Sequence, residues 1–370
     1  MIVGVPAEIK PDEYRVSMTP AGVRELTANG HRVVVQKEAG RGSSFDDAAY
    51  VAVGAEILPS AADVFAAADL IVKVKEPQPS EIAMLEPRHV LFTYLHLAAY
   101  PAEAKGLVGC GATSIAYETV ALENGSLPLL APMSEIAGRM AVQAGAHHLE
   151  RTHGGRGILL GGVPGVRPAR VTVLGAGTSG SNAAKMAAGL GAEVVVMDIN
   201  VDRLRHLDDL SWGRLITVHS SRHSVGEYVA SSDLVIGAVL VAGARAPVLV
   251  TEEQVAAMRP GSVIVDIAID QGGCIETARE TTHHDPVYSI HGVLHYCVGN
   301  IPGAVPNSST WALSNATLPY AVALAQGLPA AVAAHPELVG GINVARGKVT
   351  HKAVADSLGL EYTDPAEVIG

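Results

Sequence analysis

The sequence predicts an α/β protein with two doubly wound domains, one of them inserted into the other. Short runs rich in Val and Ile alternate with Ala-rich helical segments, which is typical of buried parallel strands joined by helices. The chain has 370 residues, about twice the length of a typical domain, so two separate cores are expected. Long helices predicted at 132–151 and 310–326 flank an inner α/β series that starts at 170, which favours an insertion.

Local patterns place the elements of both series. Thr19 followed by Pro20 combines a capping hydroxyl with a proline in the first turn, and so predicts the start of a helix. Ser134 is expected to cap the helix at 132–151. After 310–326 the pattern indicates a C-terminal helical region. Strands are expected at 2–5, 32–36, 69–75, 89–95, 113–117 and 170–174.

Composition excludes several classes of protein. Hydrophobic residues make up 48% of the chain, which excludes a disordered chain, and only 17% are charged, so other subunits are expected to cover part of the surface. The net charge of −11 argues against nucleic acid or an anionic membrane as the main partner. Three scattered cysteines, no evident signal peptide and no run able to span a bilayer predict a cytoplasmic protein.

The strongest motif is Gly175-Ala-Gly177-Thr-Ser-Gly180, which follows an apolar strand and opens a helix. In a Rossmann-like domain the first glycine allows the tight turn, the second lets the backbone approach a pyrophosphate, and the third lets helix and sheet pack closely. Asp198 ends the next strand, where a carboxylate binds the ribose hydroxyls and repels a 2′-phosphate. The motif therefore predicts NAD rather than NADP, and Arg203, one helical turn later, could reach the same ribose.

Two later strand ends in this series also suggest cofactor contacts. The segment 238–243 would pass beside the nicotinamide, although an ordinary strand–loop junction explains its pattern equally well. The strand at 263–266 is followed by Asp270 and a glycine pair. Asp270 would face the crevice and orient a water or an ammonium group, with a simple turn-capping role as the alternative.

These patterns divide the chain into three stretches. Residues 1–130 are assigned to the first part of a substrate domain, 131–305 to the NAD-binding Rossmann domain, and 306–370 to the returning part of the substrate domain. The substrate domain is therefore expected to be discontinuous in sequence.

Polar residues at three strand ends of the first domain predict the chemistry. Arg15 follows the first strand, Lys75 follows Lys73 on the same face of another strand end, and His96 ends a third. A guanidinium and an ammonium bind a carboxylate, and an imidazole exchanges a proton near neutral pH. Each residue also has a structural alternative: a surface arginine, a strand-end lysine and a hydrogen-bonded core histidine.

Histidine pairs occur elsewhere, but none has convincing zinc geometry: adjacent residues diverge on a helix or a strand, and the pair four residues apart lies in a segment typical of strand and turn. No metal site is predicted from them. The pairs are His147-His148, His283-His284 and His291/His295.

Over essentially its full length the chain resembles the alanine dehydrogenase family. The resemblance is carried by EIKPDEYRVSMTPAGV (8–23), KVKEP (73–77), FTYLHLAA (92–99), the stretch 133–166 and VDIAIDQGG (265–273). The wider family includes the NAD(H)-binding component of proton-translocating transhydrogenase and the lysine-forming saccharopine dehydrogenase. The resemblance implies reversible oxidative deamination of L-alanine to pyruvate and ammonium, with NAD as hydride acceptor, by a homo-oligomer, mostly a hexamer.

The resemblance also implies roles for particular residues. Substrate contacts fall on Arg15 and Lys75, and acid–base roles on His96 and Asp270. A divalent-ion site of some members falls on Gly327, which offers no ligand, so no metal is carried over. Cofactor contacts fall on Ser134, Thr178, Ser179, Asp198, Arg203, Ser220, Val239, Leu240, Ile267, Ala268, Ile269, Asp270, Arg279, Val298, Gly299, Asn300 and Ile301.

Three alternatives stay open at this point. The first is a transhydrogenase component that exchanges hydride without amino-acid chemistry, and the second is an NAD-binding sensor that has lost catalysis. The third is an enzyme for a related 2-oxo acid such as glyoxylate. The first would not need the arginine, lysine and histidine of the substrate domain, and the second would be expected to have lost them.

Overall fold

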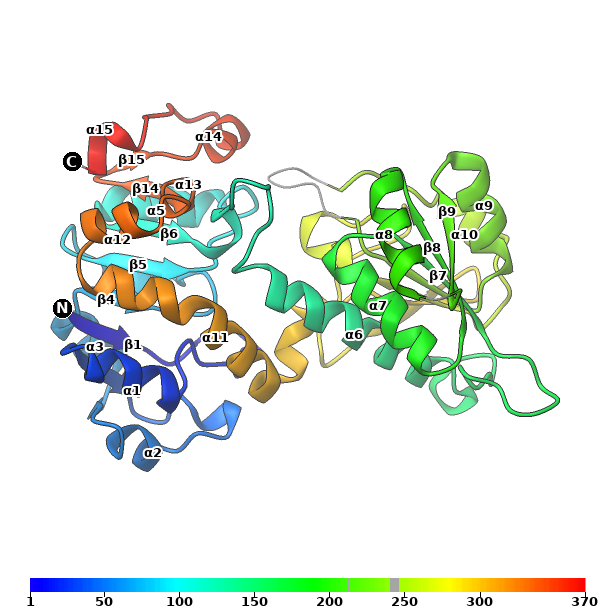
Figure 1. The fold of residues 1–370 in the computed structure, drawn as a ribbon, viewed down its shortest axis with the longest axis horizontal. Helices are drawn as coiled ribbons and strands as arrows, with labels where there is room; N and C mark the ends of the chain where they lie inside the picture. The colour runs from blue at the N-terminus through cyan, green and yellow to red at the C-terminus, as the bar shows by residue number, and fades with distance from the viewer. Residues whose placement is uncertain (212, 240–245, 370) are drawn as a thin grey trace. The chain divides into compact units, whose positions relative to one another are not determined.

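The structure, a computed structural model, describes residues 1–211, 213–239 and 246–369. Its contacts divide the chain into two units, one formed by Met1–Met133 with Val305–Gly370 and the other by Ser134–Ala304 (Figure 1). Each unit contains one sheet. The C-terminal stretch thus packs with the N-terminal one.

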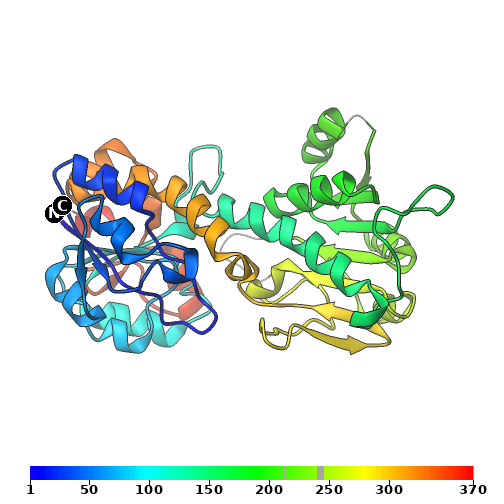
Figure 2. The same ribbon diagram turned by 90° about the horizontal axis from the view of Figure 1, so that it is seen from below.

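The sheet of the first unit has the strand order β15-β14-β6-β5-β4-β1-β2-β3. Strands β1 to β6 pair in parallel, and the chain moves outward in one direction from β1 and in the other from β4. This is a doubly wound sheet, and Figure 2 shows helices on both of its faces. Its strands are β1 (Ile2–Val5), β2 (Arg32–Gln36), β3 (Glu56–Leu58), β4 (Leu70–Val72), β5 (Val90–Thr93), β6 (Thr113–Ala116), β14 (Ile342–Ala345) and β15 (Lys348–Val349).

The helices of this unit begin where local chemistry dictates. Helix α1 (Pro20–Ala28) is capped by Thr19, whose Oγ1 accepts a hydrogen bond from the amide of Gly22 at 3.2 Å, as predicted. Helix α11 (Pro306–Ala325) begins earlier than the predicted Thr310. The others are α2 (Asp47–Val51), α3 (Ala61–Ala67), α4 (Pro79–Ile82), α5 (Pro101–Cys110), α12 (Leu328–Ala334), α13 (Leu338–Gly341), α14 (Lys352–Leu358), α15 (Ala366–Ile369) and the 3₁₀ turns η1 (Arg41–Ser43) and η2 (Tyr117–Thr119).

The prediction of a helical C-terminal region is only partly correct, because this region also contains two strands. Strands β14 and β15 form an antiparallel hairpin, and β14 pairs with β6 at the edge of the sheet. Arg346 and Gly347 form the turn, both at positive φ. Sequence patterns missed this hairpin because its strands are too short to show a strand period.

The second unit has the strand order β12-β13-β11-β10-β7-β8-β9, parallel except for β12, and the chain reverses direction between β7 and β10. This is the Rossmann order. Its elements are β7 (Arg170–Leu174), β8 (Glu193–Asp198), β9 (Leu215–His219), β10 (Leu234–Gly237), β11 (Val263–Asp266), β12 (Val287–Ile290), β13 (Val293–Tyr296), α7 (Thr178–Gly189), α8 (Val201–Ser211), α9 (Arg222–Ser231), α10 (Glu252–Ala256), η3 (Arg151–His153), η4 (Ile267–Gln271) and η5 (Ile301–Ala304).

Helix α6 (Ala131–His148) joins the two units, since its first turn belongs to one and its remainder to the other. The prediction that Ser134 caps this helix is wrong, because the helix begins at Ala131 and Ser134 is its fourth residue. Two prolines near the start, Pro128 and Pro132, made the boundary hard to place, since proline is tolerated in a first turn.

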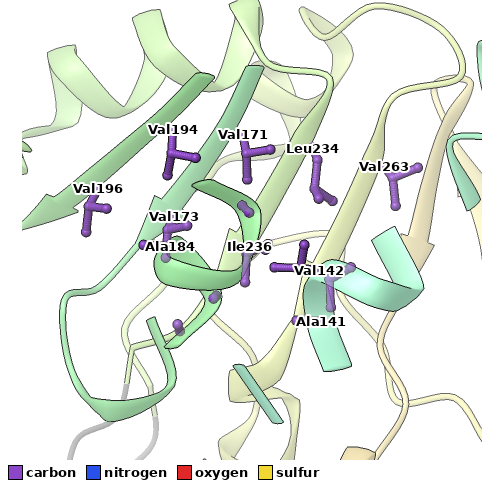
Figure 3. Close-up of a cluster of buried hydrophobic side chains, with 14 of the residues drawn as sticks. Ala141, Val142, Val171, Val173, Ala184, Val194, Val196, Leu234, Ile236 and Val263 are labelled. Carbon is purple, nitrogen blue, oxygen red and sulfur yellow. The ribbon is translucent and has the colours of Figure 1, made fainter. Parts of the chain in front are cut away.

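The core of the second unit lies between α6 and the sheet. Figure 3 shows Ala141 and Val142 of α6 facing Leu234, Ile236 and their neighbours on the central strands, and these side chains are fully buried. The helix can approach because position 145 is glycine: a Cβ there would lie 2.6 Å from the Leu234 side chain. This packing fixes the central strands whose ends carry the glycine-rich turn.

Candidate functional site

Three predicted residues of the first unit follow three neighbouring parallel strands. Arg15 follows β1, Lys75 follows β4 and His96 follows β5. Because parallel strands end at one edge of a sheet, these residues share the carboxyl edge. That edge, at the switch between β1 and β4, is where doubly wound folds bind ligands.

Arg15 is buried and held by Glu13. The carboxylate of Glu13 accepts hydrogen bonds from Arg15 Nε at 2.7 Å and Nη2 at 2.5 Å, while Nη1 lies 3.0 Å from the Met133 sulfur. Burial raises the pKa of Glu13, but the guanidinium outweighs burial and lowers the pKa to about 2. The surface alternative is therefore excluded: Arg15 belongs to a buried, paired site.

The two lysines after β4 have different surroundings. Lys73 is fully buried, and its ammonium lies 3.0 Å from Glu8 and 2.7 Å from Glu81. Lys75 is also buried, yet its ammonium forms no hydrogen bond or salt bridge with the residues that the structure describes. Lys73 thus has a structural role, and Lys75 is the lysine with capacity for a ligand.

Glu8 also fixes the backbone that carries Lys75. Its carboxylate accepts hydrogen bonds from the amides of Val74 at 2.7 Å and Lys75 at 3.4 Å. Burial raises the pKa of Glu8, only partly offset by Lys73. The chain after β4 is therefore held at a defined position although it has left the strand.

His96 has a constrained backbone. Its φ is +49°, in the left-handed region, and its amide donates a hydrogen bond of 2.6 Å to Glu118 on η2. The amide of Leu95 donates to the same carboxylate at 3.2 Å, and the imidazole stacks on Tyr94 with centroids 5.7 Å apart. Such strain persists only where the surroundings enforce it, and it is common at functional sites.

Shared carboxylates link the three groups. Burial raises the pKa of Glu76, but Lys75, Lys10 and His96 outweigh it and lower the pKa. Lys75 also contributes to the lowered pKa of Glu13, the partner of Arg15. The first unit therefore gathers a guanidinium, an ammonium and an imidazole around two carboxylates.

In the second unit, the predicted cofactor residues follow the carboxyl ends of its parallel strands. The strands pair in parallel, so these residues share one edge of the sheet. Gly175 to Ser179 follow β7, Asp198 ends β8, Ser220 follows β9, Val239 follows β10, Ile267 to Asp270 follow β11, and Val298 to Ile301 follow β13. Leu240 lies outside the described residues.

The turn after β7 can accept only glycine at two positions. Gly175 has φ of +103°, and a Cβ there would lie 2.6 Å from the Ala238 carbonyl oxygen. A Cβ on Gly180 would lie 1.8 Å from the Gly175 carbonyl oxygen. Gly177 precedes the first residue of α7, and a Cβ there would meet nothing within 4 Å. This open helix N-terminus has the geometry that binds a pyrophosphate.

Asp198 connects this turn to the next strand. Its carboxylate accepts hydrogen bonds from the amides of Ala176 and Asn200, both at 2.7 Å, and Arg203 approaches it at 3.7 Å. Asp198 is buried, whereas the Arg203 side chain is mostly exposed. A carboxylate in this position beside the turn fits a ribose of NAD.

Family models match nearly the whole chain. A model described as alanine dehydrogenase/PNT, N-terminal domain, matches residues 4–137, and one described as alanine dehydrogenase/PNT, C-terminal domain, matches 141–352. Alanine dehydrogenases from Halomonas elongata and Mycobacterium tuberculosis are 56% and 53% identical to this chain, each over 100% of both sequences.

The chain belongs to the alanine dehydrogenase/PNT family.

Solved structures of two kinds share the fold of this family. One named L-alanine dehydrogenase matches with a TM-score of 0.93 and 51% identity, over 97% of this chain and 99% of that one. A transhydrogenase from Sinorhizobium meliloti matches with a TM-score of 0.81 and 28% identity, over 95% of this chain and 100% of that one. The predicted family and the predicted pair of Rossmann-like domains are confirmed. None of the described helices has the length and apolar character needed to cross a membrane.

Asp270, for which the family resemblance implies an acid–base role, is an exposed residue on the 3₁₀ turn η4. Its carboxylate accepts a hydrogen bond of 3.2 Å from the amide of Asn300. The turn is anchored by Asp266, which sequence reasoning did not single out: its carboxylate accepts hydrogen bonds from the amides of Ala268 and Cys274 at 3.0 and 2.8 Å. Asp266 is fully buried, so it positions the turn while Asp270 stays accessible.

The other predicted residues have more ordinary surroundings. Arg279 is exposed, with its guanidinium 4.0 Å from the centre of the Tyr288 ring. His295 is buried and hydrogen-bonded to Thr277, and His291 pairs with exposed Glu252, so this pair is divided between two separate contacts.

Proposed function

We propose that this chain catalyses the reversible, NAD-dependent oxidative deamination of L-alanine to pyruvate and ammonium. The observation that carries this is the buried Lys75 ammonium, which forms no salt bridge with the described residues and shares a sheet edge with Arg15 and His96, in a chain whose full-length relatives are named alanine dehydrogenase. A small 2-oxo or 2-amino acid needs cations for its carboxylate and a proton-exchanging group for its amine.

Arg15 and Lys75 would bind the substrate carboxylate. Glu13 fixes the Arg15 guanidinium through hydrogen bonds from Nε and Nη2, which would hold it in position for the substrate carboxylate. Lys75 would supply a second charge from the segment after β4 without giving up a salt bridge within the described chain. Two cations from the segments after two strands fix the orientation of the carboxylate and hence of Cα.

The second unit, within the predicted 131–305 domain, would hold NAD. The open N-terminus of α7, the glycines that a side chain would clash with, and buried Asp198 fit the pyrophosphate and the ribose. NAD, when bound, supplies the hydride acceptor. The other cofactor contacts implied by the family, Leu240 included, belong to this proposal.

His96 would accept a proton from the substrate ammonium, because hydride can leave Cα only when the amine is neutral. An imidazole suits this exchange because it can gain and lose a proton near neutral pH, and Glu118 fixes the backbone of His96. Asp270 would stabilise the iminium formed on the substrate and position the attacking water. The water adds to this carbon, and collapse of the carbinolamine gives pyruvate and ammonia.

We also place residues 1–130 and 306–370 in the substrate domain, and expect a cytoplasmic homo-oligomer, by family a hexamer. A charged fraction of 17% supports a surface partly covered by other subunits.

The test monitors the oxidation of NADH by its absorbance. The assays contain pyruvate plus ammonium, glyoxylate plus ammonium, or one of a panel of other 2-oxo acids. The highest kcat/KM is expected with pyruvate, and only when ammonium is present. A transhydrogenase component would instead pass hydride to a second pyridine nucleotide without any oxo acid. That result, with no pyruvate turnover, would refute the proposal.

A further inference from the structure

A second group of chemically active side chains lies at the end of α6, within the second unit. His147 is in the last turn of the helix, Glu150 follows it, and His153 ends η3. The Glu150 carboxylate lies 3.9 Å from Nδ1 of His147 and 3.2 Å from Nδ1 of His153. The two imidazole rings have centroids 3.7 Å apart. One ligand atom from each of the three residues lies within 4.8 Å of the others.

These donors match the chemistry of a zinc-like ion. Zn²⁺ binds histidine nitrogen and carboxylate oxygen at about 2.0–2.2 Å, and in sites with three protein ligands a water takes the fourth position. Ligands of a tetrahedral ion at that distance lie about 3.4 Å apart. The three side chains are exposed, so modest rotations would bring them from their present separations to that spacing.

The local backbone also favours a cation here. The last carbonyl groups of a helix carry partial negative charge, and His147 lies beside them at the end of α6. The segment then turns sharply: Gly154, which follows η3, has a φ of +92°, and this turn keeps His153 against the helix end. Arg151 opposes a cation, but this residue is exposed and its charge is screened by water.

We propose that His147, Glu150 and His153 form a binding site for a zinc-like divalent metal ion. The adjacent pair His147-His148 did not suggest the spacing His-x-x-Glu-x-x-His, because the second histidine of the site is His153 on η3 rather than His148. His148 is instead buried, and its Nδ1 has no hydrogen-bond partner among the described residues. A cavity of about 580 Å³, lined in part by His147 and Glu150, leaves room for the water ligand.

The test is metal binding by the whole protein, purified without a histidine tag and stripped with a chelator. Equilibrium dialysis against Zn²⁺ with metal analysis is expected to give about one ion per chain. Co²⁺ should give the strong visible absorption of a four-coordinate site. His153→Gln and Glu150→Gln should each weaken zinc affinity by more than roughly 10–100-fold. That range is the loss expected when a residue that only hydrogen-bonds to a metal ligand is removed. His206→Gln, an exposed histidine of α8, is the matched control and should bind as the parent does.

Two outcomes overturn the proposal. One is the absence of stoichiometric binding by the parent protein. The other is metal binding that persists in the His147→Gln, His153→Gln double variant. Such binding would show that the ion is held elsewhere, for example by partly exposed Cys110. Circular dichroism and gel filtration check that each variant keeps its fold and assembly.

Discussion

The Glu13–Arg15 pair allows a quantitative test of how the substrate edge is built. Glu13→Gln keeps the size of the side chain but removes the charge that two hydrogen bonds from Arg15 engage. The pKa of Glu13 falls from its usual value of 4.5 to about 2, which corresponds to about 3.4 kcal/mol of stability at pH 7. That agrees with the roughly 3–5 kcal/mol that breaking a buried pair costs.

The pH dependence has a definite sign. Because the folded pKa is depressed, the carboxylate stabilises the fold fully above pH 4.5, and the contribution is lost as pH falls toward about 2. A difference of about 300-fold in the opening equilibrium at pH 7 should shrink to about 10-fold at pH 3.

Hydrogen exchange read by mass spectrometry measures this equilibrium unit by unit. In Glu13→Gln the slowest amides of β1 and β4 should exchange about 300-fold faster than in the parent protein at pH 7. Peptides of β7 and β8 in the second unit are the internal control, and Glu25→Gln, an exposed glutamate on α1, is the matched substitution. Equal exchange in the Glu13 and Glu25 variants, or a difference that does not shrink in acid, would refute the reasoning.

The remaining expectations concern activity. His96→Ala should lower kcat by about 10²–10⁴ while NADH binding, measured by fluorescence, persists; near-parental turnover would remove His96 from the acid–base role. Lys75→Met should raise the KM for pyruvate with little change in melting temperature, whereas Lys73→Met should lower the melting temperature, because only Lys73 is ion-paired within the described chain. Asp198→Gly should reduce the preference for NAD over NADP, and unaltered kcat/KM ratios would contradict a ribose contact. Glu118→Gln should lower kcat and shift its pH profile, since Glu118 fixes the backbone of His96; a changed stability with an unchanged profile would make it structural only.

Much of the fold could be predicted because its signals are local. The glycine pattern from Gly175 to Gly180 meets local steric requirements, and the structure shows the clashes that a side chain would cause at Gly175 and Gly180. Thr19 and Pro20 likewise act on the helix that they begin. The β14–β15 hairpin was missed because its strands depend on pairing with β6, more than 200 positions away, rather than on their own period.

The site was predictable in part for the same reason. Residues that end parallel strands share an edge, so Arg15, Lys75 and His96 could be grouped from strand order alone. The residues that hold these three in position could not be predicted in the same way. Glu118 contacts the backbone of His96 only because β6 lies beside β5, and no pattern near either residue indicates that contact.

The surroundings of the cations explain why Lys75, rather than its neighbours, is suited to a substrate. Arg15 is bound by Glu13, Lys10 pairs with Glu76, and Lys73 is shared by Glu8 and Glu81. Each of these cations would have to compete for an incoming carboxylate against a carboxylate that it already holds. Lys75 breaks no salt bridge with the described chain when it binds an anion, and burial keeps water from screening the contact. The carboxylates around it thus fix the other cations in position, and a small acid that binds Lys75 and Arg15 displaces no existing partner of Lys75 within the described chain.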